Sequence, residues 1–197
     1  MKRLAVLASG GGRSLENLVE RSAAGELGAQ IALVLVNTPT AGALERAQRH
    51  GLEHVVVDHR RFETPAAFSA AVFAELDARA IDLAVLAGFL RLLIVPEHWR
   101  GRAINIHPAL LPKFGGKGFY GDRVHSAVLA AGESVTGCTV HYVTNEYDAG
   151  PPLLQRRVPV KPGDDAHTLA ARVFEEEKLA LPQAIALHFA GAHSTQR

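Results

Sequence analysis

Short apolar runs alternate with helical patterns along the first half of the chain, and this alternation limits the folds that the chain can adopt. An apolar run at residues 4–8 precedes a segment with Leu15, Leu18 and Val19 on one helical face. The same rhythm continues, with strand patterns at 31–36, 55–57 and 83–86 and helical patterns at 41–50 and 65–78. Strands that alternate with helices of this length predict a parallel α/β sheet with right-handed crossovers.

The second half of the chain has a different pattern. A strand at 103–106 extends the sheet, and the glycine-rich loop 111–122 leads to a helix at 124–131 and strands at 136–143 and 152–158. The helical region 166–190 is expected to be interrupted at Pro182, and the tail 193–197 is expected to be frayed. We therefore predict one domain over 1–197, with halves 1–100 and 101–197, built as a Rossmann-like, mostly parallel twisted sheet with helices on both faces.

Composition and charge narrow the classes of partner. The chain has 197 residues, of which 48% are hydrophobic, so it can bury a sizeable core. Lysine plus arginine (21) nearly balances aspartate plus glutamate (20), which gives no electrostatic argument for nucleic acid or a membrane surface. A strand pattern that begins close to Met1 leaves no room for a signal peptide, and the single Cys138 fits a reducing cytoplasm and a core position. A small-molecule partner is expected.

A polar pair lies at the end of the strand at 103–106. Asn105 and His107 are two residues apart, so they point to the same face of the strand. An amide donor beside a titratable imidazole suits a reaction in which a carbonyl oxygen becomes negative, because the amide holds the oxyanion while the imidazole moves a proton. The pair therefore indicates acyl-type transfer, and the alternative is a strand end whose polar groups bind neighbouring backbone.

A glycine turn follows the first strand. Ser-Gly-Gly-Gly at 9–12 places backbone N–H groups at the start of a helix, where a phosphate fits. A dinucleotide fingerprint is incomplete, because Leu15 replaces its third glycine and Asn37 stands where a ribose-binding acid is wanted. No Gly-Lys-Ser/Thr of a Walker loop follows. The alternative is a tight turn that uses glycine for its permissive dihedral angles.

Two further residues carry potential chemistry. A carboxylate such as Asp148, if brought near His107, would raise the pKa of the imidazole above its reference of about 6.5 and keep it protonated as an acid. Alone, Asp148 is typical of a turn before Gly150, and His141 is typical of a structural strand histidine. The histidines show no zinc-site spacing, so no metal is expected.

Together the segments at 9–12, 85–93, 105–112, 137–141 and 148–150 resemble the phosphoribosylglycinamide formyltransferases, folate-dependent enzymes of purine synthesis. The resemblance spans nearly the whole chain, and its specific parts are the segments 85–93 and 105–112 in this order. It implies the formyltransferase fold, with phosphate binding in the first half and catalysis and folate binding in the second. The implied catalytic residues are Asn105, His107 and Asp148.

The resemblance also implies the binding residues. Backbone at Gly11, Gly12 and Arg13 would hold the ribonucleotide phosphate, and Glu177 would reach the ribose. The residues implied for the folate pocket are Leu90, Arg91, Leu92, Leu93, Asn105, His141, Thr144, Asn145 and Asp148. The chain departs from the family pattern at Arg13-Ser14, where Ser-Asn is common, and in a longer loop at 115–121 that would be a variant lid.

The function implied by the resemblance is transfer of the formyl group of 10-formyltetrahydrofolate, as co-substrate, to the amine of glycinamide ribonucleotide. We also expect the protein to act in the cytoplasm as a homodimer. Nucleic acid, membranes and metal ions are not expected as partners. Three alternative functions share parts of this pattern. A 10-formyltetrahydrofolate hydrolase would carry a further domain before the first strand, and a transfer-RNA formyltransferase would carry a C-terminal barrel. A non-catalytic nucleotide-binding module would leave Asn105 and His107 unexplained.

Overall fold

A computed structural model describes residues 1–191 of the chain, and these residues form two compact units. The first unit consists of Met1–Asn105 and Val143–Asn145. The second consists of Ile106–Tyr142 and the described residues from Glu146 onward. The predicted tail at 193–197 lies outside the described residues.

The first unit is built on a parallel sheet. Its strands lie in the order β3-β2-β1-β4-β5, and every neighbouring pair is parallel. This arrangement confirms the prediction from the alternation of strands and helices. The strands are β1 (Lys2–Ala8), β2 (Ala29–Val36), β3 (His54–Val56), β4 (Leu83–Leu86) and β5 (Ala103–His107), of which the last two residues belong to the second unit.

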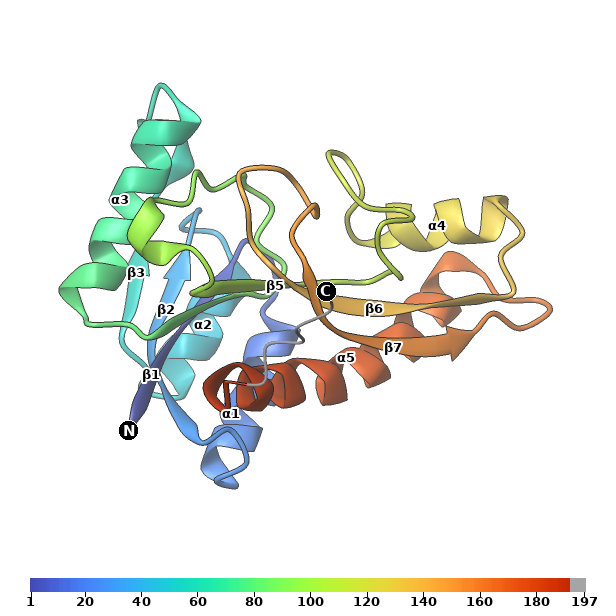
Figure 1. Cartoon of the computed structure of the whole chain (residues 1–197), viewed down its shortest axis with the longest axis horizontal. Coiled ribbons are helices and arrows are strands. Elements are labelled where there is room, and N and C mark those ends of the chain that lie inside the picture. Colours follow the sequence, from blue (N-terminus) through green and yellow to red (C-terminus); the bar gives the residue numbers. More distant parts are fainter. Residues whose placement is uncertain (192–197) are drawn as a thin grey trace. The chain divides into compact units, whose positions relative to one another are not determined.

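Helices cover both faces of this sheet, as expected. They are α1 (Arg13–Ala23), α2 (Gly42–Arg49) and α3 (Pro65–Ala78), with short 3₁₀ turns η1 (His59–Arg61) and η2 (Glu97–Trp99). Side chains of α3 such as Phe68 and Val72 pack in one buried cluster with alternate strand residues such as Leu7 and Leu35. Figure 1 shows α3 on one side of the strands and α2 on the other.

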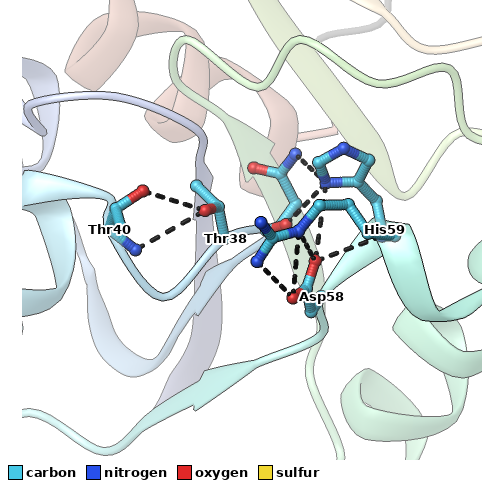
Figure 2. Close-up of polar contacts among 6 residues, drawn as sticks. Thr38, Thr40, Asp58 and His59 are labelled. Atoms are coloured by element: carbon cyan, nitrogen blue, oxygen red, sulfur yellow. Dashed lines mark hydrogen bonds and ion pairs between the residues drawn. The ribbon is translucent and has the colours of Figure 1, made fainter.

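Polar contacts fix the loops that follow β2 and β3 (Figure 2). The backbone carbonyl of Asn37 accepts a hydrogen bond from Nδ1 of His59 at 2.8 Å. The Asp58 carboxylate accepts from the Arg60 side chain, which lowers the pKa of Asp58 to about 2. Thr38 and Thr40 share a hydrogen bond between their hydroxyls at 3.0 Å. Asn37, which replaces the acid of a dinucleotide fingerprint, is thus part of the contacts that hold η1.

The second unit contains a β-hairpin and two helices. Strands β6 (Val135–Tyr142) and β7 (Pro152–Pro159) are antiparallel, and helices α4 (Asp122–Ala130) and α5 (Ala166–Phe189) contact each other. Gly137 allows the two strands to approach, because a Cβ there would lie 1.9 Å from the carbonyl oxygen of Arg156. Helix α5 begins with a capping box in which Asp165 and Thr168 bond each other's backbone N–H groups.

The predicted interruption at Pro182 is wrong, because α5 continues through it to Phe189. Proline removes one helical hydrogen bond, which favours a break in an isolated helix. In this helix the flanking residues Leu181, Ala184 and Ile185 are buried, and their packing outweighs the lost bond. Among residues 1–191, no helix is long and apolar enough to cross a membrane.

Candidate active site

In the second unit, Asp148 lies between two histidine side chains. Its Oδ2 is 3.5 Å from Nδ1 of His107, and its Oδ1 is 3.5 Å from Nε2 of His141. The side chains are only 5%, 3% and 11% exposed for His107, His141 and Asp148. Asp148 therefore lies beside His107, a contact that the sequence left open, and His141 joins the same buried cluster.

Strand ends and a turn place these side chains. His107 is the last residue of β5, His141 is the penultimate residue of β6, and Asp148 follows in the loop before β7. The backbone of Asp148 has φ of 54°, a left-handed conformation that aspartate tolerates better than most residues. Gly115 lies against this turn, and a Cβ at Gly115 would come within 3.2 Å of the Asp148 Cβ and 2.4 Å of a Leu111 methyl.

Backbone groups bind the remaining polar atoms of the cluster. The Gly116 N–H donates to Oδ2 of Asp148 at 2.8 Å. Nε2 of His107 lies 2.8 Å from the Phe114 carbonyl oxygen, and Nδ1 of His141 lies 2.9 Å from that of Tyr142. A carbonyl oxygen only accepts, so each of these two nitrogens carries a proton. The opposite nitrogen of each ring therefore faces Asp148.

Burial and charge compete in setting the pKa values. Burial lowers the pKa of His107, while the Asp148 charge and the Phe114 carbonyl act in the opposite direction. Burial alone would raise the pKa of Asp148, but the contacts with His141, His107 and the Gly116 N–H lower it overall. The expectation that Asp148 keeps His107 protonated is thus corrected, because the loss of solvent around the ring outweighs the carboxylate. An ionised Asp148 beside a ring that readily releases its proton is suited to proton transfer.

Thr139 fixes the chain that follows His107. Its hydroxyl donates to the Ala109 carbonyl at 2.7 Å and accepts from the Leu111 N–H at 3.1 Å. Gln155 donates to the same oxygen at 2.9 Å. Sequence reasoning did not identify this role, although Thr139 shares a strand face with His141. Among residues 1–191, no cluster of histidine, cysteine, aspartate and glutamate has the arrangement of a metal site.

Asn105 lies in the first unit, in the middle of β5, and is half-buried. Strand alternation directs its side chain to the same side of β5 as that of His107. Glu177 belongs to the second unit, where it lies half-buried on α5. Cys138 is fully buried on β6, and burial, with the nearby charge of Glu177, raises its pKa to about 12. This confirms Cys138 as a core residue.

In the first unit, the glycine turn packs against α2. The Ala43 N–H donates to the Gly10 carbonyl at 3.0 Å, and Nε of Arg46 donates to the Gly11 carbonyl at 2.7 Å. The carbonyl and the following N–H of a peptide point in opposite directions, so the N–H groups of Gly11 and Gly12 point away from α2. Gly12 has φ of 76°, and a Cβ there would lie 2.8 Å from the Ala43 backbone. Glycine is therefore required at this turn.

A charged cluster holds Arg46 in place. The Glu16 carboxylate is 2.5 Å from Arg46, 2.7 Å from Arg49 and 2.7 Å from His50. The hydrogen bonds with Arg46 and His50 lower the pKa of Glu16 to about 2. Arg13, which was expected to contribute to phosphate binding, is the exposed first residue of α1.

The residues implied for the folate pocket have different exposures. Leu90 is 47% exposed and Arg91 is exposed, but the Leu93 side chain is 1% exposed in the core, which leaves its backbone for a ligand. Leu92 and Thr144 are half-buried. Oδ1 of Asn145 accepts a hydrogen bond from the Val95 N–H at 2.8 Å.

Comparisons with known proteins agree on one family. The formyl transferase model matches residues 2–185. The trifunctional purine biosynthetic protein adenosine-3 of Drosophila pseudoobscura pseudoobscura is 42% identical over 97% of this chain and 14% of its own length. A chloroplastic phosphoribosylglycinamide formyltransferase of Vigna unguiculata is 38% identical over 89% of this chain and 57% of its own length.

The chain thus spans about a seventh of the length of the first of these relatives and just over half of the second. A solved structure covers more of both proteins. Glycinamide ribonucleotide transformylase 1 from Symbiobacterium toebii superposes with a TM-score of 0.90 and is 37% identical, over 97% of this chain and 89% of that one. On the match to residues 2–185 and this structural likeness, the chain belongs to the formyl transferase family.

Proposed function

We propose that this protein transfers the formyl group of 10-formyltetrahydrofolate to the amine of glycinamide ribonucleotide, a step of purine synthesis. The observation that carries the proposal is the buried cluster of Asp148 with His107 and His141. Asn105 precedes His107 by two residues along β5. The relatives named phosphoribosylglycinamide formyltransferase and glycinamide ribonucleotide transformylase support this proposal. A formyl transfer needs an oxyanion donor and a group that moves protons, and these residues supply both.

The reaction begins when the glycinamide amine attacks the formyl carbon. A carbon–nitrogen bond forms, and the formyl oxygen becomes an oxyanion to which the Asn105 amide donates a hydrogen bond. The proton lost by the amine passes through the site to the folate nitrogen, which leaves as the original carbon–nitrogen bond breaks. The ionised Asp148 accepts this proton and returns it to the folate nitrogen, because Nε2 of His107 already carries a proton and Nδ1 faces the carboxylate.

The proton on Nε2 of His107 is a second oxyanion donor in this scheme. The Phe114 carbonyl accepts that proton in the structure. The formyl oxygen therefore replaces the Phe114 carbonyl as acceptor when the co-substrate binds. The loop at 115–121, which follows Phe114 and carries positive φ at Gly116, Gly118 and Gly121, moves with it as a lid.

The remaining assignments follow the resemblance. The N–H groups of Gly11 and Gly12, with Arg13, bind the ribonucleotide phosphate, and Glu177 binds the ribose. The exposed part of residues 90–93, with Thr144 and Asn145, lines the pterin site. We further propose a homodimer that acts in the cytoplasm and binds no nucleic acid, in keeping with the balanced charge of the chain. Light scattering after size-exclusion chromatography tests the dimer.

A turnover assay tests the proposed function. The protein is mixed with 10-formyltetrahydrofolate, with and without glycinamide ribonucleotide, while tetrahydrofolate release and the mass of the ribonucleotide are followed. We expect release of tetrahydrofolate that depends on the ribonucleotide and yields the formylated product. Release without the ribonucleotide, with formate as product, would assign a hydrolase, and no turnover in either mixture would leave a binding protein.

A further inference from the structure

Residues 90–95 form an irregular segment between β4 and η2 of the first unit. The side chains of Leu93 and Val95 are buried in the core, whereas those of Leu90 and Ile94 are 47% and 36% exposed. The segment is therefore anchored on one side and presents aliphatic side chains on the other. A flat apolar ring packs well on such a surface, provided that the backbone beneath it is fixed.

Side-chain oxygens from three separate parts of the chain bind the backbone of this segment. The Leu90 N–H donates to the Ser9 hydroxyl at 2.9 Å, the Ile94 N–H to that of Ser69 at 2.8 Å, and the Val95 N–H to Oδ1 of Asn145 at 2.8 Å. A segment without a strand partner needs such acceptors, since an unpaired N–H is unfavourable when shielded from water. These bonds determine the course of the segment.

Ser69 is the buried member of the set. Its side chain is 0% exposed within α3, and its hydroxyl donates to the Pro65 carbonyl at 2.6 Å. A hydroxyl has one proton, so towards Ile94 it acts only as an acceptor. Serine in a helix interior is less favourable than alanine. Its presence at a fully buried position is explained by the hydrogen bond that it receives from the segment.

We propose that Ser69 is a positioning residue for the folate co-substrate, acting through the backbone of Ile94. This inference rests on the proposed function, in which residues 90–93 line the pterin site. Asn145 has the same role through Val95, and Ser9 through Leu90. Ser69 itself does not touch the co-substrate, so its removal should weaken folate binding and leave the chemical step unchanged.

The test is the Ser69→Ala variant. We expect KM for 10-formyltetrahydrofolate to rise about three- to tenfold, as for the loss of one hydrogen bond, with kcat and KM for the ribonucleotide unchanged. In native-state hydrogen exchange, the Ile94 amide should exchange faster than in the wild type while the Val95 amide keeps its rate. An unchanged KM for the co-substrate would overturn the proposal.

Thr64→Ala is the matched control. It removes a hydroxyl from the N-cap of the same helix, where the Thr64 side chain accepts a hydrogen bond from the Ala67 N–H at 3.1 Å and forms none with residues 90–95. We expect this variant to lower the melting temperature and to keep the wild-type KM for the co-substrate. An equal rise in both variants would mean that general loosening of α3, and not the Ile94 contact, affects binding.

Calorimetric titration with 10-formyltetrahydrofolate alone separates this inference from the proposed function. Wild-type protein that binds the co-substrate but transfers no formyl group defeats the proposed function, while weaker binding by Ser69→Ala still supports the positioning role. If Ser69→Ala does not fold, Ser9→Ala is compared with Ser9→Thr, which keeps a hydroxyl acceptor for the Leu90 N–H. If only the alanine variant binds the co-substrate more weakly, the result supports the proposal that these contacts position the segment. If both variants bind equally well, the proposal is overturned.

Discussion

The glycine turn of the first unit and the Asp148 cluster of the second hold polar groups in opposite ways. Around the turn, the carboxylate of Glu16 is 25% exposed and pairs with arginines that reach into solvent. In the cluster, Asp148 is 11% exposed and pairs with two buried histidines. Solvent screens the first set of charges but hardly affects the second. Changes in the cluster should therefore alter the chemical step, and changes at the turn should alter binding only.

The largest effect is expected for Asn105→Ala, two residues before His107 along β5. Loss of one oxyanion donor typically lowers kcat by about 10² to 10³, and KM for both substrates should stay near the wild-type value. Steady-state kinetics with each substrate varied in turn would measure this. Turnover close to that of the wild type would remove Asn105 from the catalytic set.

Asp148→Asn comes next, with a fall in kcat of about 10² and a shifted pH profile. The Asp148 charge raises the pKa of His107, so its removal should lower that pKa further. The limb of the pH–rate profile that belongs to His107 should then move to lower pH. Asp122→Asn, on the exposed first turn of α4, serves as control and should keep the wild-type profile. If this limb stays at the wild-type pH, Asp148 does not influence the pKa of His107.

A smaller effect is expected at the turn. Arg46→Met loses the bond to the Gly11 carbonyl, which should raise KM for the ribonucleotide about three- to tenfold and spare kcat. Arg49→Met is the matched control, because Arg49 pairs with the same Glu16 carboxylate but forms no hydrogen bond with the turn. An exposed ion pair is worth about 0–1 kcal/mol, so this variant should bind normally. Equal effects in the two variants would indicate a general charge effect.

The smallest effect is expected in the pH dependence of the melting temperature. Burial lowers the pKa values of His107 and His125, so the unfolded chain binds more protons once the pH falls below about 6.5. The contribution of these two histidines to the free energy of unfolding is greatest above that pH. It decreases as the pH falls towards their pKa values in the folded protein. The melting temperature should drop by a few degrees from pH 8 to pH 5.5, and by less in His125→Gln. Equal drops in the wild type and in His125→Gln would contradict this account.

Patterns along the chain were sufficient to predict the parallel sheet of the first unit. Alternation also pointed to Asn105 and His107, because these depend on residue type and spacing. Asp148 was implied only by the resemblance to the phosphoribosylglycinamide formyltransferases, since in isolation it is typical of a turn. The contacts of Phe114 and Gly116 with the cluster were not predictable, since their backbone groups are placed by loop dihedral angles that no side-chain pattern encodes.

Two errors arose from reading local chemistry without packing. Pro182 was expected to break a helix, but the buried residues around it keep α5 continuous. The pKa of His107 was judged from its charged neighbour, whereas burial of the ring is the larger influence. The continuity of α5 and the pKa of His107 both depend on how deeply the residues are buried, and burial cannot be read from the sequence.

The central claim is that the site on β5 and in the second unit moves a formyl group from folate to an amine. Carbon-13 NMR with co-substrate labelled in the formyl group tests it directly, in wild-type protein and in Asn105→Ala with glycinamide ribonucleotide present. We predict that the label appears in the formylated ribonucleotide with the wild type and far more slowly with the variant. Label that accumulates as formate, or that reaches the ribonucleotide equally fast with both proteins, would contradict the claim.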